Sequence, residues 1–431
     1  MTVSTAASTT DFGLPRPGTH LVAFRITNVG SARHTEELNL TVDKTEETGT
    51  FPTYAPHGPL AVTAVAALFG ANASGTSTVI GAVANMRAAV LTSYIRRTAP
   101  ASPAHRPFAL SPDDAAEPST YEIELVRDGE QWTYGFAVSA RGIEREWLHS
   151  VTAADGLRTW IDRDAARADR GGCAYRWHGL TPDSGRLEHL GSDRSLTLSL
   201  GGLLQVGPFR TVYDFFRTEL LCITHRDAQQ QERARARLAE STELRRRLGP
   251  LLMAADLGVD AVEIDPADGE VKLAHTAAGG RSVLLDWAME SSGTRALVLV
   301  LERVLWALEH GSVLLIDGLG SPLHPLLTAE ITTLFVASWS NGRQAQLLCT
   351  SHAVALLGGA RHGQSLEPHH VWLAERGRDG STEVYPLTDA KPGRDEDLAD
   401  SYLAGAFGGV PGISEGRVGR ALLAAGALTQ G

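Results

Sequence analysis

The chain has 431 residues, of which 43% are hydrophobic and 21% are charged, a composition typical of globular proteins rather than of disordered or fibrous ones. Its length allows one large domain with insertions, or two or three smaller domains. The formal net charge of -11 excludes a generally basic nucleic-acid-binding surface, although a local basic patch stays open.

Cysteine usage and the absence of long apolar runs point to the cytosol. Cys173, Cys222 and Cys349 are far apart and form no CxxC pair, which is typical of reduced thiols. No apolar run is long enough to span a bilayer. Residues 1–20 begin without the basic and apolar segments of a signal peptide, and we expect them to form a flexible polar tail. We therefore predict a cytoplasmic protein without a membrane segment.

The first third of the chain shows strand and helix patterns in alternation. It predicts two strands, a buried strand and a helix, over 21–26, 38–42, 62–69 and 78–96. A Pro/Ala/Ser-rich stretch, 98–118, is expected to be a loop. Alternating side chains on both sides of Asp128-Gly129 predict a β-hairpin over 121–136. The segment 165–212 is mixed and gives no clear pattern.

The stretch from Asp227 to Leu248 is crowded with Arg, Glu, Gln and Ala and predicts a charged helix. We favour a solvated helix with charge pairs four residues apart. The alternative is an arm or lid that contacts DNA or a partner protein.

The last third again alternates strands and helices. It predicts short strands around a turn at Asp268-Gly269, then a helix, a strand, a helix and a strand over 294–309, 312–316, 323–338 and 346–350. After these we expect one more helix, and a strand pair near 371–373 and 383–385. The chain from Asp389 on is polar and Gly-rich and is expected to be a tail. Alternating strands and helices imply an α/β fold with a largely parallel sheet.

One glycine-containing segment lies between a predicted buried strand and a predicted helix. It reads GANASGTS and fits the pattern GxxxxG followed by [KT]-S. The glycines let the backbone turn so that its N–H groups and the helix N-terminus face phosphate oxygens. We therefore predict a phosphate-binding loop in which Ser77 ligates Mg²⁺. The binding residues would be Gly70, Asn72, Ala73, Ser74, Gly75, Thr76, Ser77 and Thr78.

Position 76 holds Thr where this motif carries Lys. A lysine acts as a point charge on the phosphates, and two unit charges about 4 Å apart attract by roughly 4 kcal/mol at an effective dielectric constant of about 20. Affinity for a triphosphate should fall without it, and stabilisation of the transition state should fall further. The alternative is an accidental Gly/Ala/Ser loop before a helix.

A second motif ends the predicted strand 313–317, where four apolar residues precede Asp317. This is the Walker B arrangement, in which the carboxylate positions Mg²⁺. The next residue in ATPases with this motif is a Glu that activates the attacking water. Here it is Gly318, which has no side chain for that task.

Two further motifs complete the set. Ser292-Gly293 opens the predicted helix 294–309 and could donate N–H groups to a γ-phosphate across a dimer interface; the alternative is that Ser291 or Ser292 only caps the helix. His352 follows a predicted strand and matches a histidine that contacts the γ-phosphate, although a histidine at a strand end is more often structural. The acidic cluster 395–397 is expected to be a solvated turn rather than a metal site.

The order of these motifs resembles that of bacterial AAA-type, ABC/SMC-clade ATP-binding proteins of restriction-linked and abortive-infection defence loci, relatives of the ATPase half of overcoming-lysogenization-defect proteins. The resemblance runs from about Leu21 to about Ile413. The segments that carry it are 21–28, 69–75, 117–124, 134–136, 291–295, 323–325, 350–352 and 372–373. The family's usual loop reads GANASGKS and its usual Walker B reads D-E-L, so Thr76 and Gly318 depart from it.

The resemblance implies a P-loop NTPase of the ABC-ATPase head type, with a mixed or parallel sheet, an added antiparallel β lobe and a helical insertion. The parts would be a tail, an N-terminal lobe, an insertion with a charged arm, a C-terminal lobe and a second tail, over 1–20, 21–165, 166–255, 256–388 and 389–431. The implied ligands are ATP and Mg²⁺. The implied partners are a second copy or a paralogous ATPase, and an effector nuclease; contact with nucleic acid stays open.

Three hypotheses about function follow. In the first, the chain binds nucleotide and acts as a switch with weak or lost hydrolysis, by analogy in phage defence. In the second, it is a slow but genuine ATPase in which a nearby residue replaces the lost groups. In the third, it is a non-catalytic subunit whose Ser292-Gly293 completes the ATP site of an intact paralogue. We favour the first, with the third close behind.

Overall fold

The computed structural model describes residues 19–43, 48–98, 102, 104–167, 174–176, 184–224, 228–321, 323–358, 366–394, 396–412, 414 and 416–425. Most of the expected N-terminal tail, together with Cys173, Pro322, Asp395 and Ile413, lies outside these residues. Within the described ranges, the helices are too short or too polar to cross a bilayer.

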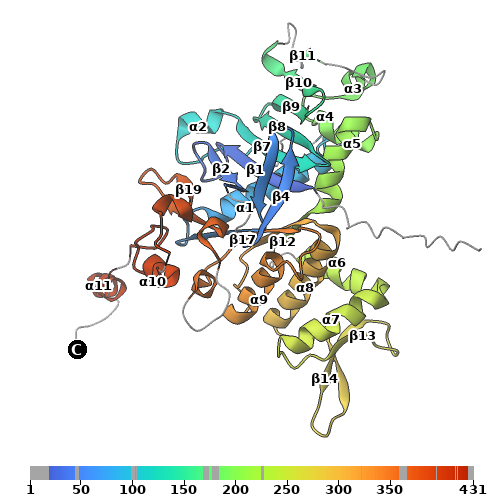
Figure 1. Cartoon of the computed structure of the whole chain (residues 1–431), viewed down its shortest axis with the longest axis vertical. Coiled ribbons are helices and arrows are strands. Elements are labelled where there is room, and N and C mark those ends of the chain that lie inside the picture. Colours follow the sequence, from blue (N-terminus) through green and yellow to red (C-terminus); the bar gives the residue numbers. More distant parts are fainter. Residues whose placement is uncertain are drawn as a thin grey trace, which may run out of the picture.

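A six-stranded sheet forms the centre of the molecule (Figure 1). Five neighbouring strands are parallel, and the sixth returns antiparallel. In spatial order they are β12 (Leu220–Thr224), β16 (Val313–Asp317), β17 (Gln346–Thr350), β6 (Val65–Gly70), β18 (Val371–Arg376) and β19 (Thr382–Pro386). The central strands are buried along nearly their whole length, because helices cover both faces of a parallel sheet. The predicted largely parallel sheet is confirmed.

Different helices cover the two faces of this sheet. Alternate side chains of a strand point to opposite faces, so Ala67 and Phe69 join one core cluster while Ala66 and Leu68 join another. The first cluster contains α8 (Ser292–His310) and α9 (Pro325–Val336), and the second contains α1 (Thr76–Thr92). These three helices match the predicted ones within a few residues at each end.

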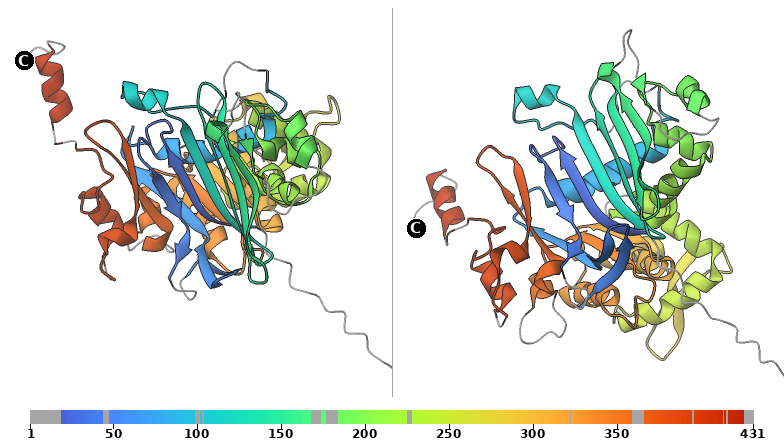
Figure 2. Two further views of the ribbon diagram at one scale, coloured as in Figure 1. Left: turned by 90° about the horizontal axis from the view of Figure 1, so that it is seen from above. Right: turned by 45° about the horizontal axis from the view of Figure 1, so that its top comes forward.

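A seven-stranded antiparallel sheet packs on the α1 side (Figure 2). Its order is β11 (Ala174–Tyr175), β10 (Gly156–Asp164), β9 (Ile143–Thr152), β8 (Glu130–Val138), β7 (Ser119–Arg127), β1 (His20–Thr27) and β2 (Glu36–Asn39). The predicted hairpin is β7–β8, and both of its turn residues, Asp128 and Gly129, have positive φ, as a type I′ hairpin turn requires.

Two small antiparallel sheets and several helices complete the described chain. The sheets are β3 (Thr41–Val42), β5 (Gly58–Thr63) and β4 (Thr50–Ala55), and β13 (Ala261–Ile264), β14 (Val271–Thr276) and β15 (Ser282–Asp286). The remaining helices are α2 (Pro112–Ala116), α3 (Ser184–Leu190), α4 (Thr197–Leu203), α5 (Gly207–Asp214), α6 (Ala228–Glu240), α7 (Thr242–Ala254), α10 (Leu398–Leu403) and α11 (Arg417–Ala424).

Several predicted elements differ from the structure. The predicted strand 62–69 is divided, because β5 ends at Thr63 and β6 begins at Val65. The predicted loop 98–118 contains α2, which Ser111 caps by accepting the N–H of Asp114. The stretch 166–255, expected to be an insertion, also contributes β12 to the central sheet.

The predicted charged helix is two helices, α6 and α7, that meet at Ser241. This residue caps α7 by accepting the N–H of Leu244 at 3.1 Å, so a local side-chain bond competes with continuation of the helix. Arginines of this pair form ion pairs within the fold: Arg237 with Glu302, Arg235 with Glu270, Arg246 with Glu243 and Arg247 with Glu309. We expected charge pairs four residues apart, but none of these four pairs has that spacing. Three of these pairs, those of Arg237, Arg235 and Arg247, join the two helices to other parts of the fold.

The stretch expected to be a C-terminal tail contains a buried element. Tyr402 of α10 is 7% exposed and packs edge-on against Phe69 of β6, with ring centroids 5.9 Å apart. Asp397 caps α10, and Glu396 accepts hydrogen bonds from Gly393 and Ser401, so this acidic segment has structural roles. No group of three metal-ligating side chains occurs in the described part of the chain. By contrast, α11 is exposed at every position and stands apart from the body in Figure 2.

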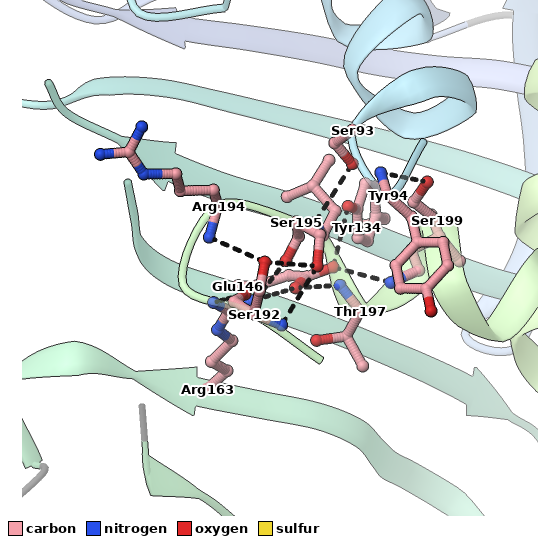
Figure 3. Close-up of polar contacts among 12 residues, drawn as sticks. Ser93, Tyr94, Tyr134, Glu146, Arg163, Ser192, Arg194, Ser195, Thr197 and Ser199 are labelled. Atoms are coloured by element: carbon pink, nitrogen blue, oxygen red, sulfur yellow. Dashed lines mark hydrogen bonds and ion pairs between the residues drawn. The ribbon is translucent and has the colours of Figure 1, made fainter. Parts of the chain in front are cut away.

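A buried ion pair fixes α4 to the antiparallel sheet (Figure 3). Glu146 and Arg163 have fully buried side chains, 3.5 Å apart. Glu146 also accepts the N–H groups of Thr197 and Leu198, at 2.7 and 2.9 Å, and the hydroxyl of Tyr134 at 3.1 Å. A buried carboxylate therefore satisfies the start of α4.

The C-terminal end of α1 reaches the same place. The hydroxyl of Ser93 accepts the N–H of Leu196 at 3.1 Å, and Ser199 accepts the N–H of Tyr94 at 3.3 Å (Figure 3). The helix that follows the glycine loop is thus joined at its far end to α4 and, through Glu146, to the antiparallel sheet.

Candidate nucleotide-binding site

The glycine loop joins the buried strand β6 to α1 and presents backbone N–H groups. Ala73 and Gly75 have positive φ of 68° and 104°, which turn the chain between the two elements. Gly75 is the N-cap residue of α1, and no side chain caps this helix. The first N–H groups of α1 therefore have no capping side chain, a state that suits an anionic ligand.

Packing explains why two positions of the loop are glycine. A Cβ built on Gly70 would lie 2.7 Å from the carbonyl oxygen of Ala374 and would overlap the Ser74 hydroxyl. A Cβ on Gly75 would overlap the Thr382 hydroxyl. The side chain of Thr76 is buried, with its Cγ2 atom 3.1 Å from the place that a Cβ of Gly70 would take.

The Walker B carboxylate contacts the glycine loop directly. The Ser77 hydroxyl donates to Oδ1 of Asp317 at 2.9 Å, across 240 positions of sequence. The Thr350 hydroxyl, at the end of β17, donates to the same oxygen at 2.9 Å and accepts the N–H of Gly318 at 2.7 Å. The carboxyl ends of β6, β16 and β17 therefore meet at one edge of the sheet, where ligands of parallel α/β sheets bind.

Thr350 is a site residue that the sequence analysis missed. A hydroxyl at the last position of a strand next to the Walker B strand was the signal. That signal is weak, because the order of the strands in the sheet decides which strand ends are neighbours.

His352 lies at the same edge. Ser351, which precedes it, donates its N–H to the carbonyl of Leu68 at 3.0 Å and its hydroxyl to the carbonyl of Leu319 at 2.8 Å. These bonds fix the chain between β6 and the loop after β16. His352 follows as an exposed residue.

Gly318, in the place of the catalytic glutamate, has a left-handed backbone with φ of 84°. Nothing lies closer than 3.7 Å to the position of a Cβ there, so space is available. The backbone angle itself disfavours any other residue. The loss of the glutamate is thus accompanied by a backbone that does not suit one.

The predicted signature residues, Ser292 and Gly293, are the first two residues of α8. Ser291, not Ser292, caps α8, because its hydroxyl accepts the N–H of Thr294 at 3.0 Å. Glu290, before it, is hydrogen-bonded to His275 of β14 at 2.7 Å. The hydrogen bond of Glu290 therefore joins this helix start to the β13–β15 sheet.

The residues present fit a magnesium-bound phosphate group. Ser74 is 2% exposed, and its hydroxyl has no hydrogen-bond partner within the described residues, as expected of a group that a ligand would satisfy. Ser77 and Asp317 offer the hard oxygen ligands that Mg²⁺ prefers. Asn72 and Ala73 are exposed at the loop surface. The absent group is the cation that a lysine at position 76 would supply.

Comparison with known proteins gives a family. Residues 65–358 match the model of the AAA_21 family, described as "AAA domain, putative AbiEii toxin, Type IV TA system". No curated protein matches the chain.

Two solved structures are similar in chain path. The SMC head domain from Thermotoga maritima has a TM-score of 0.39 at 12% identity, covering 85% of this chain and 98% of that one. An SMC head bound to the C-terminal winged-helix domain of ScpA has a TM-score of 0.38 at 12% identity, covering 86% and 99%.

Proposed function

Because the chain belongs to the AAA_21 family of P-loop ATPases, we propose that it binds ATP with Mg²⁺ and acts as a nucleotide-dependent switch whose hydrolysis is weak or lost. The observation that supports this most directly is the 2.9 Å hydrogen bond between Ser77 and Asp317. It joins the two motifs that hold Mg²⁺ in such ATPases, which are 240 positions apart in the sequence.

Each side chain has a distinct role in this proposal. The N–H groups of residues 70–78 bind the phosphate oxygens, and Ser77 and Asp317 hold Mg²⁺. Bound Mg²⁺ neutralises charge on the phosphates. Thr350 keeps the carboxylate of Asp317 oriented through the 2.9 Å hydrogen bond that it donates. In this proposal His352 contacts the γ-phosphate.

Weak hydrolysis follows from the two replaced residues. Thr76 has no charge to stabilise the negative charge that develops on the transferred phosphoryl group. Gly318 cannot orient or activate water. Binding depends less on these groups than hydrolysis does, because the loop amides and Mg²⁺ contact the ground state as well.

Titration of the full chain with a fluorescent ATP analogue tests the proposal, with phosphate release measured in the same sample. We expect Mg²⁺-dependent binding with turnover near zero. Thr76→Lys should bind at least about tenfold more tightly, since it restores an attraction of roughly 4 kcal/mol before desolvation. Asp317→Asn should abolish the dependence on Mg²⁺. Absence of binding at millimolar ATP would sink the proposal.

A second candidate function rests on the intact start of α8. The chain keeps Ser292-Gly293 at the N-terminus of α8, where Ser292 is exposed, while its own phosphate site lacks two groups. We propose as the alternative that it completes the ATP site of a paralogous ATPase in a heterodimer. Co-purification as an ATPase-active complex with such a paralogue would support this candidate, and a symmetric homodimer would argue against it.

The biological setting that we propose is phage defence, beside an effector such as a nuclease. It follows from the sequence resemblance and from the toxin named in the family description. Deleting the gene from its native locus should raise the plating efficiency of a restricted phage, and complementation with the Asp317→Asn variant should fail to restore protection.

A further inference from the structure

The phosphate loop is held from outside by a chain of hydroxyl groups. Thr382, the first residue of β19, lies 2.8 Å from the carbonyl oxygen of Ser74 and 2.7 Å from the Ser31 hydroxyl. The Ser31 hydroxyl in turn lies 2.8 Å from that of Thr78. These four residues come from β19, the loop, the β1–β2 connection and the first turn of α1.

The Thr382 hydroxyl is the donor in both of its hydrogen bonds. It has a single proton, which it shares between the Ser74 carbonyl, a group that can only accept, and the Ser31 hydroxyl. In the bond between Ser31 and Thr78 either hydroxyl can donate. The three hydroxyls and the Ser74 carbonyl thus form one connected set of hydrogen bonds.

The contact is also tightly packed and buried. Thr382 is 2% exposed. Its hydroxyl takes the space beside Gly75 that a Cβ at that position would need. The N–H of Thr382 donates to the Ser31 carbonyl at 2.7 Å, so backbone and side chain join the same two segments.

We propose that Thr382, with Ser31, is a positioning residue of the nucleotide site. By fixing the Ser74 carbonyl it aims the following N–H groups of the loop at the phosphates. Both residues lie outside the span 65–358 that matches the family. The β18–β19 hairpin is therefore part of the site rather than an appended edge.

The hydroxyl is not needed for the hairpin itself. Thr382 pairs with Arg376 through the backbone ladder of β18 and β19, which a side-chain change leaves intact. Within the turn of the hairpin, Asp379 accepts a hydrogen bond from Arg33 at 3.1 Å, which ties the hairpin to the β1–β2 connection independently. Loss of the Thr382 hydroxyl should consequently act on the loop and not on the hairpin.

The test compares Thr382→Val, Thr382→Ser and a matched control in the full chain. Valine keeps the shape and removes the hydroxyl, while serine keeps the hydroxyl. The control is Thr332→Val, since Thr332 is 3% exposed and its hydroxyl also donates to a backbone carbonyl, that of Ala329, at 2.8 Å. The readouts are amide hydrogen exchange over residues 70–78 without nucleotide, and the Kd of the fluorescent ATP analogue.

We expect Thr382→Val to speed exchange in the loop and to raise the Kd, each about tenfold, because a buried carbonyl loses its partner. Thr382→Ser should stay within about twofold of the natural chain, and Thr332→Val should leave the loop unchanged. Unchanged exchange in Thr382→Val, or equal effects in the control, would overturn the inference.

The part of this inference that concerns ATP rests on the proposed function, but the exchange measurement does not. If the natural chain fails to bind ATP while Thr382→Val still loosens the loop, the proposed function fails and the positioning role survives. If ATP binds and loop exchange is unaffected, only the positioning role fails.

Discussion

At the scale of single residues, Gly318 and Thr76 differ in how easily they could be reversed. Thr76 follows the loop at the start of a regular helix, where lysine fits the backbone. Gly318 has φ of 84°, which lysine, glutamate and alanine all adopt only with strain. A single substitution can therefore restore the cation but not the catalytic carboxylate.

Gly318→Glu should lower the free energy of unfolding by about 1–3 kcal/mol and should not raise ATP turnover, even when combined with Thr76→Lys. Thermal unfolding and phosphate release measure the two effects. Gly318→Ala is the matched control, with the same backbone strain and no carboxylate, and should lose a similar amount of stability. A gain in turnover of tenfold or more at unchanged Tm would contradict this expectation.

At the scale of elements, a buried carboxylate joins the two large sheets. Glu36 of β2 is 8% exposed and accepts the N–H of Val384 of β19 at 2.7 Å. Burial raises the pKa of the Glu36 carboxyl from 4.5 to about 7; the Val384 N–H opposes this rise, and the charge of Glu383 adds to it. This junction lies two residues from Thr382, so the protonation state of Glu36 bears on the hairpin.

The raised pKa of Glu36 predicts how stability depends on pH. Between pH 4.5 and about 7 the folded state binds the proton more tightly than the unfolded state. Protonated Glu36 thus adds its full contribution to the free energy of unfolding below pH 4.5. This contribution is lost as pH rises to about 7, and it amounts to about 1.4 kcal/mol per unit of pKa shift. Urea unfolding from pH 4.5 to 8 should show this loss. Glu36→Gln should flatten the curve, and an unchanged slope would count against the assignment.

The Glu146–Arg163 pair makes a second prediction at this scale. Glu146→Ala should cost about 3–5 kcal/mol, because it leaves a buried guanidinium without its opposite charge and two helix N–H groups without their acceptor. The control is Glu243→Ala, which breaks an exposed pair with Arg246 and should change stability by less than about 1 kcal/mol. Urea unfolding compares them, and similar losses for both variants would show that burial is not the cause.

At the scale of the whole molecule, the C-terminal part divides into a packed and an unpacked section. Ala399, Tyr402 and Phe407 are buried against the face of the central sheet that carries α8 and α9. Residues 417–424 form α11 and are exposed throughout. The boundary between the two sections falls near Gly412.

Truncation should reveal this boundary. Ending the chain after Gly412 removes α11 and should leave the Tm nearly unchanged. Ending it after Asp397 uncovers Phe69 by removing Tyr402, and should cost at least about 3–5 kcal/mol, the range for deleting one large buried side chain. Equal Tm values for the two truncations would mean that α10 contributes little to the fold.

The sequence by itself determined the elements with strong local signals. Apolar runs predicted β6, β16 and β17, the spacing of apolar residues predicted α1 and α8, and Asp128-Gly129 predicted the β7–β8 turn. The loop pattern and Asp317 were found as well, since these depend on neighbouring residues. The sequence patterns missed the break at Ser241, which depends on a single side-chain hydrogen bond that caps α7. They also missed the burial of α10, which depends on packing against residues distant in the sequence.

Only the tertiary structure decided which groups meet. Thr350 contacts Asp317, and Thr382 contacts Ser74, because the strand order places β17 beside β16 and the β18–β19 hairpin beside the loop. The left-handed angle of Gly318 and the raised pKa of Glu36 depend likewise on the folded chain. A sequence records which residues are neighbours along the chain, whereas hydrogen bonds and burial depend on distances that exist only after the sheets have packed.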